Sequence, residues 1–224
     1  MLTERTAPGL HEEVFRYLTE TFPSTIRLLD MAAGTGAWLE RLRRAGFVDL
    51  SGADIDSTSY EGPTRFVRAN LNEHFVPLVQ RQLGEERFDV ITSIETIEHL
   101  ENPSHFLRQC KDLLKPNGTL LITSPNVESM PGRLKFLIKG RLRMFEENGD
   151  LTHITPITSF LFERMAERNG FVIQSKIALL RAWPSSRRLV RGICTCLSPL
   201  LNGETYGDCH LFILHPIHGN GSGD

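Results

Sequence analysis

Short apolar runs alternate with helical spacing along most of this chain. An apolar run of about four to eight residues that ends at turn residues is typical of a buried strand. Such runs predict strands at about 26–31, 49–56, 65–72 and 171–177, and further strands that begin at Phe88, Thr119 and Cys209. Apolar residues at helical spacing predict helices within residues 1–24 and at about 36–45 and 157–169.

The order of these elements predicts the fold class. Strands and helices alternate, and a unit of strand, helix and parallel strand is almost always right-handed. The chain is therefore expected to form an α/β fold with a doubly wound, Rossmann-like sheet of seven strands and helices on both faces. The predicted organisation is an N-terminal cap helix at 1–24, one main domain at 25–217 and a disordered tail at 218–224. The main domain contains a lid insertion at about 127–156 and a second insertion at about 182–206.

The length, charge and cysteine content of the chain limit the kinds of molecule it is expected to bind and the compartment in which it is expected to work. The 224 residues suffice for one domain with a substantial core, and a formal net charge of −2 gives no general attraction to nucleic acid or membranes. No apolar run reaches the length of a membrane span, and no signal peptide pattern opens the chain. The four cysteines lack zinc-finger spacing. These observations predict a cytoplasmic protein with reduced thiols.

The first strand is followed by a turn rich in small residues. Asp30 comes before Ala32, Gly34 and Gly36, and glycines at such a turn let a ligand approach the backbone. A dinucleotide fold would have a third glycine where Leu39 stands. A phosphate-binding loop would need a lysine, and the first lysine of the chain is residue 111. An acid at this turn suits a ligand with an ammonium group or hydroxyls.

The same turn carries a family resemblance. The pattern Asp30-x-Ala32-x-Gly34-x-Gly36 resembles the first motif of class I S-adenosylmethionine-dependent methyltransferases. Residues 88–126 are similar to the ubiquinone-biosynthesis O-methyltransferase branch of that family in four motifs: Phe-Asp-x-Ile, Glu-x-x-Glu-His, Lys-Pro-x-Gly and Ser-Pro-Asn. The resemblance spans about residues 26–181. It implies S-adenosylmethionine as the cofactor and a last strand that runs antiparallel to its neighbour.

The resemblance also implies residues around the cofactor. Asp54 follows Gly36 by 18 residues, near the spacing at which an acid after the second strand meets a ribose. Asn70 stands where the family often has an aspartate facing the adenine, and an amide offers both a donor and an acceptor. Leu71 would contact the cofactor through its backbone. The expected cofactor-binding residues are Asp30, Ala32, Gly34, Gly36, Asp54, Ile55, Asn70, Leu71 and Ser93.

A possible metal site follows the fourth strand. If the segment is helical, Glu95, Glu98 and His99 share one face, and His153 would supply a fourth ligand. Some members of the resembled branch are similar in using this pattern to hold a divalent metal, so magnesium, manganese or zinc is expected. The expected catalytic residues are Glu95, His99 and His153. Two alternatives stay open: His99 acts as a general base without metal, or the segment is only an exposed polar face.

The lid insertion carries a basic and apolar pattern. Five basic residues alternate with apolar ones over 131–145, which indicates contact with a membrane surface or with an anionic or lipid-linked substrate. A solvated lid over the substrate is the alternative. The second insertion, at about 182–206, gives no clear prediction of secondary structure.

These features together predict an S-adenosylmethionine-dependent methyltransferase. The expected acceptor is a hydroxyl of a small molecule such as a catechol or quinone precursor, a natural product or a sugar. The alternatives are 2′-O-methylation of an RNA 3′ end, N-methylation, and a non-catalytic regulatory protein that binds the cofactor. The net charge speaks against a nucleic acid partner. The sequence does not indicate an oligomeric state.

Overall fold

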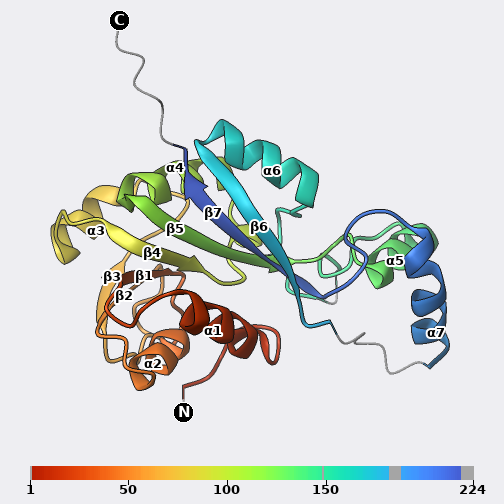
Figure 1. The fold of residues 1–224 in the computed structure, drawn as a ribbon, viewed down its shortest axis with the longest axis horizontal. Helices are drawn as coiled ribbons and strands as arrows, with labels where there is room; N and C mark the ends of the chain where they lie inside the picture. Colours follow the sequence, from red (N-terminus) through yellow and green to blue (C-terminus); the bar gives the residue numbers. More distant parts are fainter. Residues whose placement is uncertain (1, 148, 182–187, 218–224) are drawn as a thin grey trace, which may run out of the picture.

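The computed structural model describes residues 2–147, 149–181 and 188–217 of the chain (Figure 1). Its centre is one seven-stranded sheet in the order β3-β2-β1-β4-β5-β7-β6. The strands are β1 (Arg27–Met31), β2 (Asp49–Asp54), β3 (Arg65–Arg68), β4 (Phe88–Ser93), β5 (Leu114–Pro125), β6 (Phe171–Leu179) and β7 (Cys209–Pro216). All pairings are parallel except those of β7, which runs antiparallel to both β5 and β6. The predicted fold class is confirmed.

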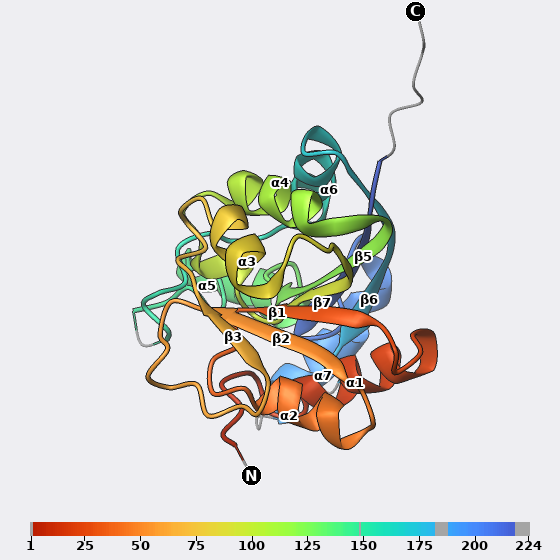
Figure 2. The ribbon, with the colours of Figure 1, turned by 90° about the vertical axis from the view of Figure 1, so that its left-hand side faces the viewer.

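Helices cover both faces of the sheet, which explains why the strands read as nearly continuous apolar runs. Figure 2 shows α3 (Val76–Leu83), α4 (Pro103–Leu113) and α6 (Ser159–Arg168) on one side and α1 (Leu10–Thr21) and α2 (Ala37–Arg44) on the other. Each side has its own buried cluster. Phe106 and Phe162 belong to the first cluster, and Leu18 and Trp38 belong to the second. The sheet is therefore buried from both directions.

The two predicted insertions meet in space. The first contains α5 (Met130–Lys139), and the second contains α7 (Arg188–Leu197) and the short η2 (Ser198–Leu200). Helices α5 and α7 pack against one another and project beyond the end of the sheet (Figure 1). Residues 182–187 of the second insertion and the tail predicted at 218–224 lie outside the described residues. The projection joins segments about 50 residues apart in sequence into one surface.

The turn after β1 fixes the geometry at the carboxyl end of the sheet. Gly36 is the N-cap residue of α2 and has a φ of 83°. A Cβ atom there would lie 2.7 Å from the Cα of Gly62, so both the conformation and the space require glycine. Ala32 also has a positive φ, 63°, at the position where the resembled motif often has glycine. The chain thus turns sharply here and leaves its backbone open to a ligand.

Candidate functional site

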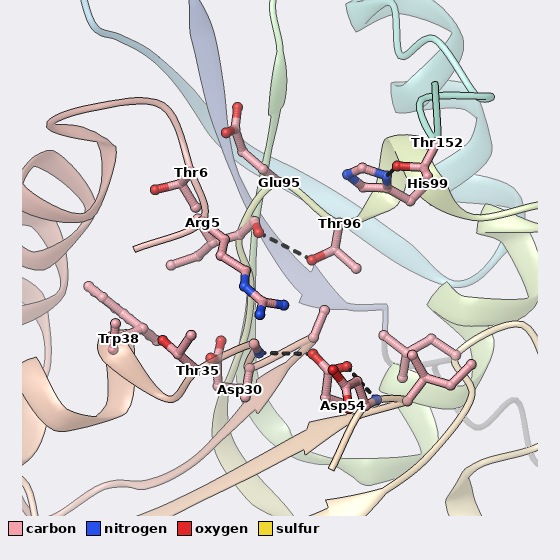
Figure 3. Close-up of a pocket in the computed structure, with 18 of the residues that line it drawn as sticks. Arg5, Thr6, Asp30, Thr35, Trp38, Asp54, Glu95, Thr96, His99 and Thr152 are labelled. Carbon is pink, nitrogen blue, oxygen red and sulfur yellow. Dashed lines mark hydrogen bonds between the residues drawn. The ribbon is translucent and has the colours of Figure 1, made fainter. Parts of the chain in front are cut away.

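A cavity of about 550 Å³ opens at the carboxyl ends of β1, β2 and β4 (Figure 3). This is where open α/β sheets bind their ligands. Of the nine residues predicted to bind the cofactor, seven line this cavity: Asp30, Ala32, Gly34, Asp54, Ile55, Asn70 and Leu71. Gly36 and Ser93 do not line it: Gly36 instead shapes the turn, and the Ser93 hydroxyl is fully buried at the end of β4.

The Asp54 carboxylate organises one side of the cavity. Its Oδ2 accepts a hydrogen bond from the Gly34 backbone at 2.8 Å, and its Oδ1 accepts one from the Asp56 backbone at 2.9 Å. These bonds tie the turn after β1 to the end of β2, as the dashed lines in Figure 3 show. The carboxylate is held in place and keeps lone pairs for a ligand.

Asp30 is the second acid of the cavity, and it is almost fully buried. The Thr92 hydroxyl donates to Asp30 Oδ1 at 2.7 Å, and the Trp38 indole donates to that same hydroxyl oxygen at 3.2 Å. Burial raises the pKa of Asp30 to about 7; the hydrogen bond from Thr92 lowers it, and the nearby Asp54 charge raises it. A cation placed in the cavity would favour the ionised form of this side chain.

The segment before α1 also borders the cavity. Residues 1–24 were predicted to form a cap helix, but the sequence pattern did not single out the residues that precede the helix. Thr3, Arg5 and Thr6 line the cavity, and so does His11 at the start of α1. The Arg5 side chain, labelled in Figure 3, is exposed to solvent, and its Nη2 donates at 3.0 Å to the hydroxyl of Ser59, which is not among the residues that line the cavity. In the sequence, Arg5 is marked only as a basic residue a few positions before an amphipathic helix. Arg5 supplies a positive charge to a pocket whose floor is acidic.

The segment 95–99 is not an α-helix, so the prediction that three ligands share one helical face is wrong. Only Ile97–His99 form a short 3-10 helix, η1, and Glu95 has a φ of 46°. The Glu95 carboxylate accepts hydrogen bonds from the Ala7 backbone at 3.0 Å and from the Cys209 thiol at 3.1 Å. Figure 3 shows it directed away from His99. Glu95 therefore lies outside the cluster that the other three residues form.

Glu98, His99 and His153 do come together. Each offers a ligand atom, and these atoms lie within 4.8 Å of one another. The Glu98 side chain is completely buried, and neither of its carboxylate oxygens has a hydrogen-bond partner among the described residues. Burial raises the pKa of Glu98 well above its usual range, and the charges of Glu95 and Asp150 raise it further. Such an unpaired buried carboxyl group is costly unless a ligand satisfies it.

Hydrogen bonds fix the tautomers of both imidazoles. The Thr152 hydroxyl donates its hydrogen to Asp150 at 2.5 Å, so it accepts the bond from His99 Nδ1 at 2.8 Å. His153 Nδ1 donates to the Met144 carbonyl at 2.8 Å. Burial and the neighbouring His153 lower the pKa of His99, which favours its neutral form. The neutral His99 ring then has its lone pair on Nε2, the arrangement in which histidine binds metals.

Backbone bonds bring His153 to this cluster from the lid insertion. The Glu98 carbonyl accepts from the Ile154 backbone at 3.0 Å and from the Thr155 backbone at 2.9 Å. The two histidine rings are 4.6 Å apart between centroids. Because His99 and Thr152 also line the cavity that Asp54 borders, the cluster adjoins this cavity.

The fold and this site define the class of protein. The strand order, the antiparallel β7 and the acid-flanked glycine turn are those of the S-adenosylmethionine-dependent methyltransferases. Residues 4–176 match the family model of a methyltransferase domain, and the chain belongs to this family. The resemblance predicted from the sequence is confirmed.

The comparisons with single proteins agree. The chain is 33% identical over 108 residues to a ubiquinone biosynthesis O-methyltransferase from Caulobacter sp. (strain K31), and the match covers 45% of this chain and 41% of that relative. A SAM-dependent methyltransferase structure from Archaeoglobus fulgidus has a TM-score of 0.62 at 21% identity and covers 92% of both chains. The [4+2]-cyclase SpnF has a TM-score of 0.59 at 15% identity and covers 94% of this chain and 81% of its own. A shared fold therefore does not fix the reaction.

Proposed function

We propose that this chain transfers a methyl group from S-adenosylmethionine to a hydroxyl of a small molecule that a divalent metal holds beside the cofactor. The observation that supports the metal is the Glu98 carboxyl group, which is fully buried, lies beside two imidazoles and has no hydrogen-bond partner within residues 2–147, 149–181 and 188–217. The similarity to ubiquinone biosynthesis O-methyltransferases supports oxygen as the acceptor atom.

The residues of the cavity suit S-adenosylmethionine. A carboxylate such as that of Asp54 accepts hydrogen bonds from both ribose hydroxyls at once, and Ile55 and Leu71 supply apolar surface for the adenine. The buried Asp30 favours a cationic methionine portion, and the Arg5 guanidinium suits its carboxylate. Both ends of the amino-acid portion of the ligand thus have a suitable group on the protein.

The acceptor side follows from the chemistry of the cluster. One carboxylate and two imidazoles suit manganese or zinc, and magnesium with additional waters. A bound divalent cation lowers the pKa of a hydroxyl that coordinates it. Vicinal hydroxyls, as in a catechol, would both bind such a cation, which would orient one of the two oxygens. The protein's own contribution is to hold His99 and His153 in fixed tautomers and to align the acceptor with the cofactor cavity.

The test is methyl transfer to a simple catechol, 3,4-dihydroxybenzoate, from radiolabelled S-adenosylmethionine. We expect transfer that a strong chelator abolishes and that added Mn²⁺ restores. Full transfer in the presence of the chelator rejects the metal and favours His99 as a general base. Cofactor binding without transfer to any hydroxyl compound rejects the enzyme and favours a regulatory protein.

We further propose that α5 contacts a membrane surface. Phe136, Leu137 and Ile138 are 54%, 81% and 76% exposed on this projecting helix. Three of the basic residues of 131–145 pair with acids of the chain itself: Lys135 with Glu146, Arg141 with Glu147 and Arg143 with Asp208. The contact is therefore expected to depend more on apolar side chains than on charge. None of the helices in the described ranges is long and apolar enough to cross a membrane.

A further inference from the structure

The segment Thr3–Ala7 is fastened over the cofactor cavity at several points. The Thr35 hydroxyl donates to the Thr3 carbonyl at 2.7 Å, and Glu4 pairs with Arg41 at 2.7 Å. Arg5 reaches Ser59 at 3.0 Å. We call Thr3–Ala7 the strap. Three of its residues, Thr3, Arg5 and Thr6, line the cavity, so a bound cofactor would lie beneath it.

The last fastening point is Glu95. Its Oε2 accepts a hydrogen bond from the Ala7 backbone at 3.0 Å, across 88 positions of sequence. Its Oε1 is occupied by the Cys209 thiol at the start of β7, at 3.1 Å. Both oxygens thus have donors, whereas both oxygens of Glu98, three residues later, have none among the described residues. The two acids of one motif have different surroundings and hence different tasks.

We infer that Glu95 is a positioning residue that latches the strap over the cofactor cavity and does not ligate the metal. Its left-handed backbone turns the side chain toward the strap and β7. Holding Ala7 also holds Arg5, two residues earlier, and with it one of the positive charges that border the cavity. The latch slows the departure of the cofactor and its product. This inference rests on the proposed cofactor site.

Two substitutions separate a latch from a metal ligand. In Glu95→Gln the amide oxygen still accepts the Ala7 N–H, so the strap stays closed. In Glu95→Ala the strap is released. The loss of one charge-assisted hydrogen bond is expected to raise the dissociation rate of S-adenosylhomocysteine about tenfold. Both variants keep the Mn²⁺ affinity of the wild type. If Glu95 were a metal ligand, both Glu95→Gln and Glu95→Ala would weaken Mn²⁺ binding.

Limited trypsin digestion reports on the strap without any ligand. Cleavage after Arg5 requires release of the strap, and mass spectrometry identifies it by the loss of residues 1–5. We expect this cleavage to be about tenfold faster in Glu95→Ala than in Glu95→Gln or the wild type. Glu128→Ala is the matched control, because Glu128 accepts a backbone N–H from Ser159 at 2.7 Å but is not among the residues lining the cavity.

A second variant removes the donor in place of the acceptor. Ala7→Pro lacks the backbone N–H. Because Ala7 also packs against the buried cluster that contains Leu18 and Trp38, a thermal melt of this variant checks that it keeps the fold. Ala7→Pro should match Glu95→Ala in cleavage and in dissociation, and the double variant should add nothing further. Equal cleavage of Glu95→Ala and the wild type overturns the inference, and so does a loss of Mn²⁺ affinity in Glu95→Gln. If S-adenosylhomocysteine does not bind at all, the proposed function fails, while the cleavage experiment still tests the latch.

Discussion

The cofactor side and the acceptor side of the site are built in different ways. The cofactor side consists of strand ends and the turns that follow them, and the backbone bonds of Asp54 hold two of these turns together. The acceptor side joins η1 to a residue of the lid insertion, His153, which is 54 positions after His99 in the sequence. Among proteins that share a fold, the turns that directly follow the strands are expected to vary little, whereas insertions tolerate changes of length and sequence. Under the proposed function, we therefore expect the cofactor side to carry the shared chemistry and the acceptor side to select the substrate.

Loss of the metal cluster should produce the largest effect. Glu98→Gln removes the only carboxylate of the cluster. We expect Mn²⁺ affinity, measured by electron paramagnetic resonance of the free ion, to fall about 100-fold, while S-adenosylhomocysteine affinity stays within about twofold. Glu101→Gln, an exposed acid three residues later, serves as the control. Unchanged Mn²⁺ affinity in Glu98→Gln would mean that Glu98 does not hold a metal on the acceptor side.

The next largest effect concerns Asp54, on the cofactor side. Asp54→Ala removes the expected ribose ligand and two backbone bonds, so S-adenosylhomocysteine affinity should fall about 30-fold, as about 2 kcal/mol of charged hydrogen bonding is lost. Mn²⁺ affinity should not change. The control is Asp49→Ala, at the opposite end of β2, where the carboxylate pairs with Arg27 and Arg65. A similar loss in both variants would point to general destabilisation of the strand.

The pH should change the affinity for the cofactor by a smaller factor. With a pKa of about 7, Asp30 is mostly protonated at about pH 6, so the affinity for S-adenosylmethionine should rise about eightfold from there to about pH 7.5. Asp30→Asn should bind weakly with a flat profile. A steep profile in that variant would assign the proton to another group.

The same shift has a consequence for stability. A raised carboxyl pKa stabilises the ligand-free fold below the unfolded pKa, and this contribution is lost as the pH rises through about 7. Asp30→Asn should therefore melt at a higher temperature than the wild type at about pH 8, although it binds less cofactor. Thermal melts across this range test the sign.

Membrane contact should show the smallest effect. Replacing Leu137 and Ile138 by Glu should lower flotation with anionic liposomes a few-fold, and added salt should change wild-type flotation little. Val48, 79% exposed before β2, is the matched control when replaced by Glu. No flotation of the wild type removes the proposal for α5 and leaves a solvated lid.

Patterns within one element were readable from the sequence, and contacts between elements were not. The strands, the glycine turn and the acid at Asp54 follow from local periodicity and spacing, and the structure places seven of the nine predicted cofactor-binding residues around the cavity. The helix assumed at Glu95 was wrong, because its left-handed backbone depends on bonds to Ala7 and Cys209 from distant segments. Arg5 and the strap were missed for the same reason. Helix α3, which buries Val76, Val79 and Leu83, was missed as well.

Calorimetric titration of the folded chain with S-adenosylhomocysteine tests the central claim most directly. We predict one ligand per chain, with affinity that depends on Asp54 and not on Glu98. A well-folded protein that gives no heat with this ligand or with S-adenosylmethionine would contradict the account.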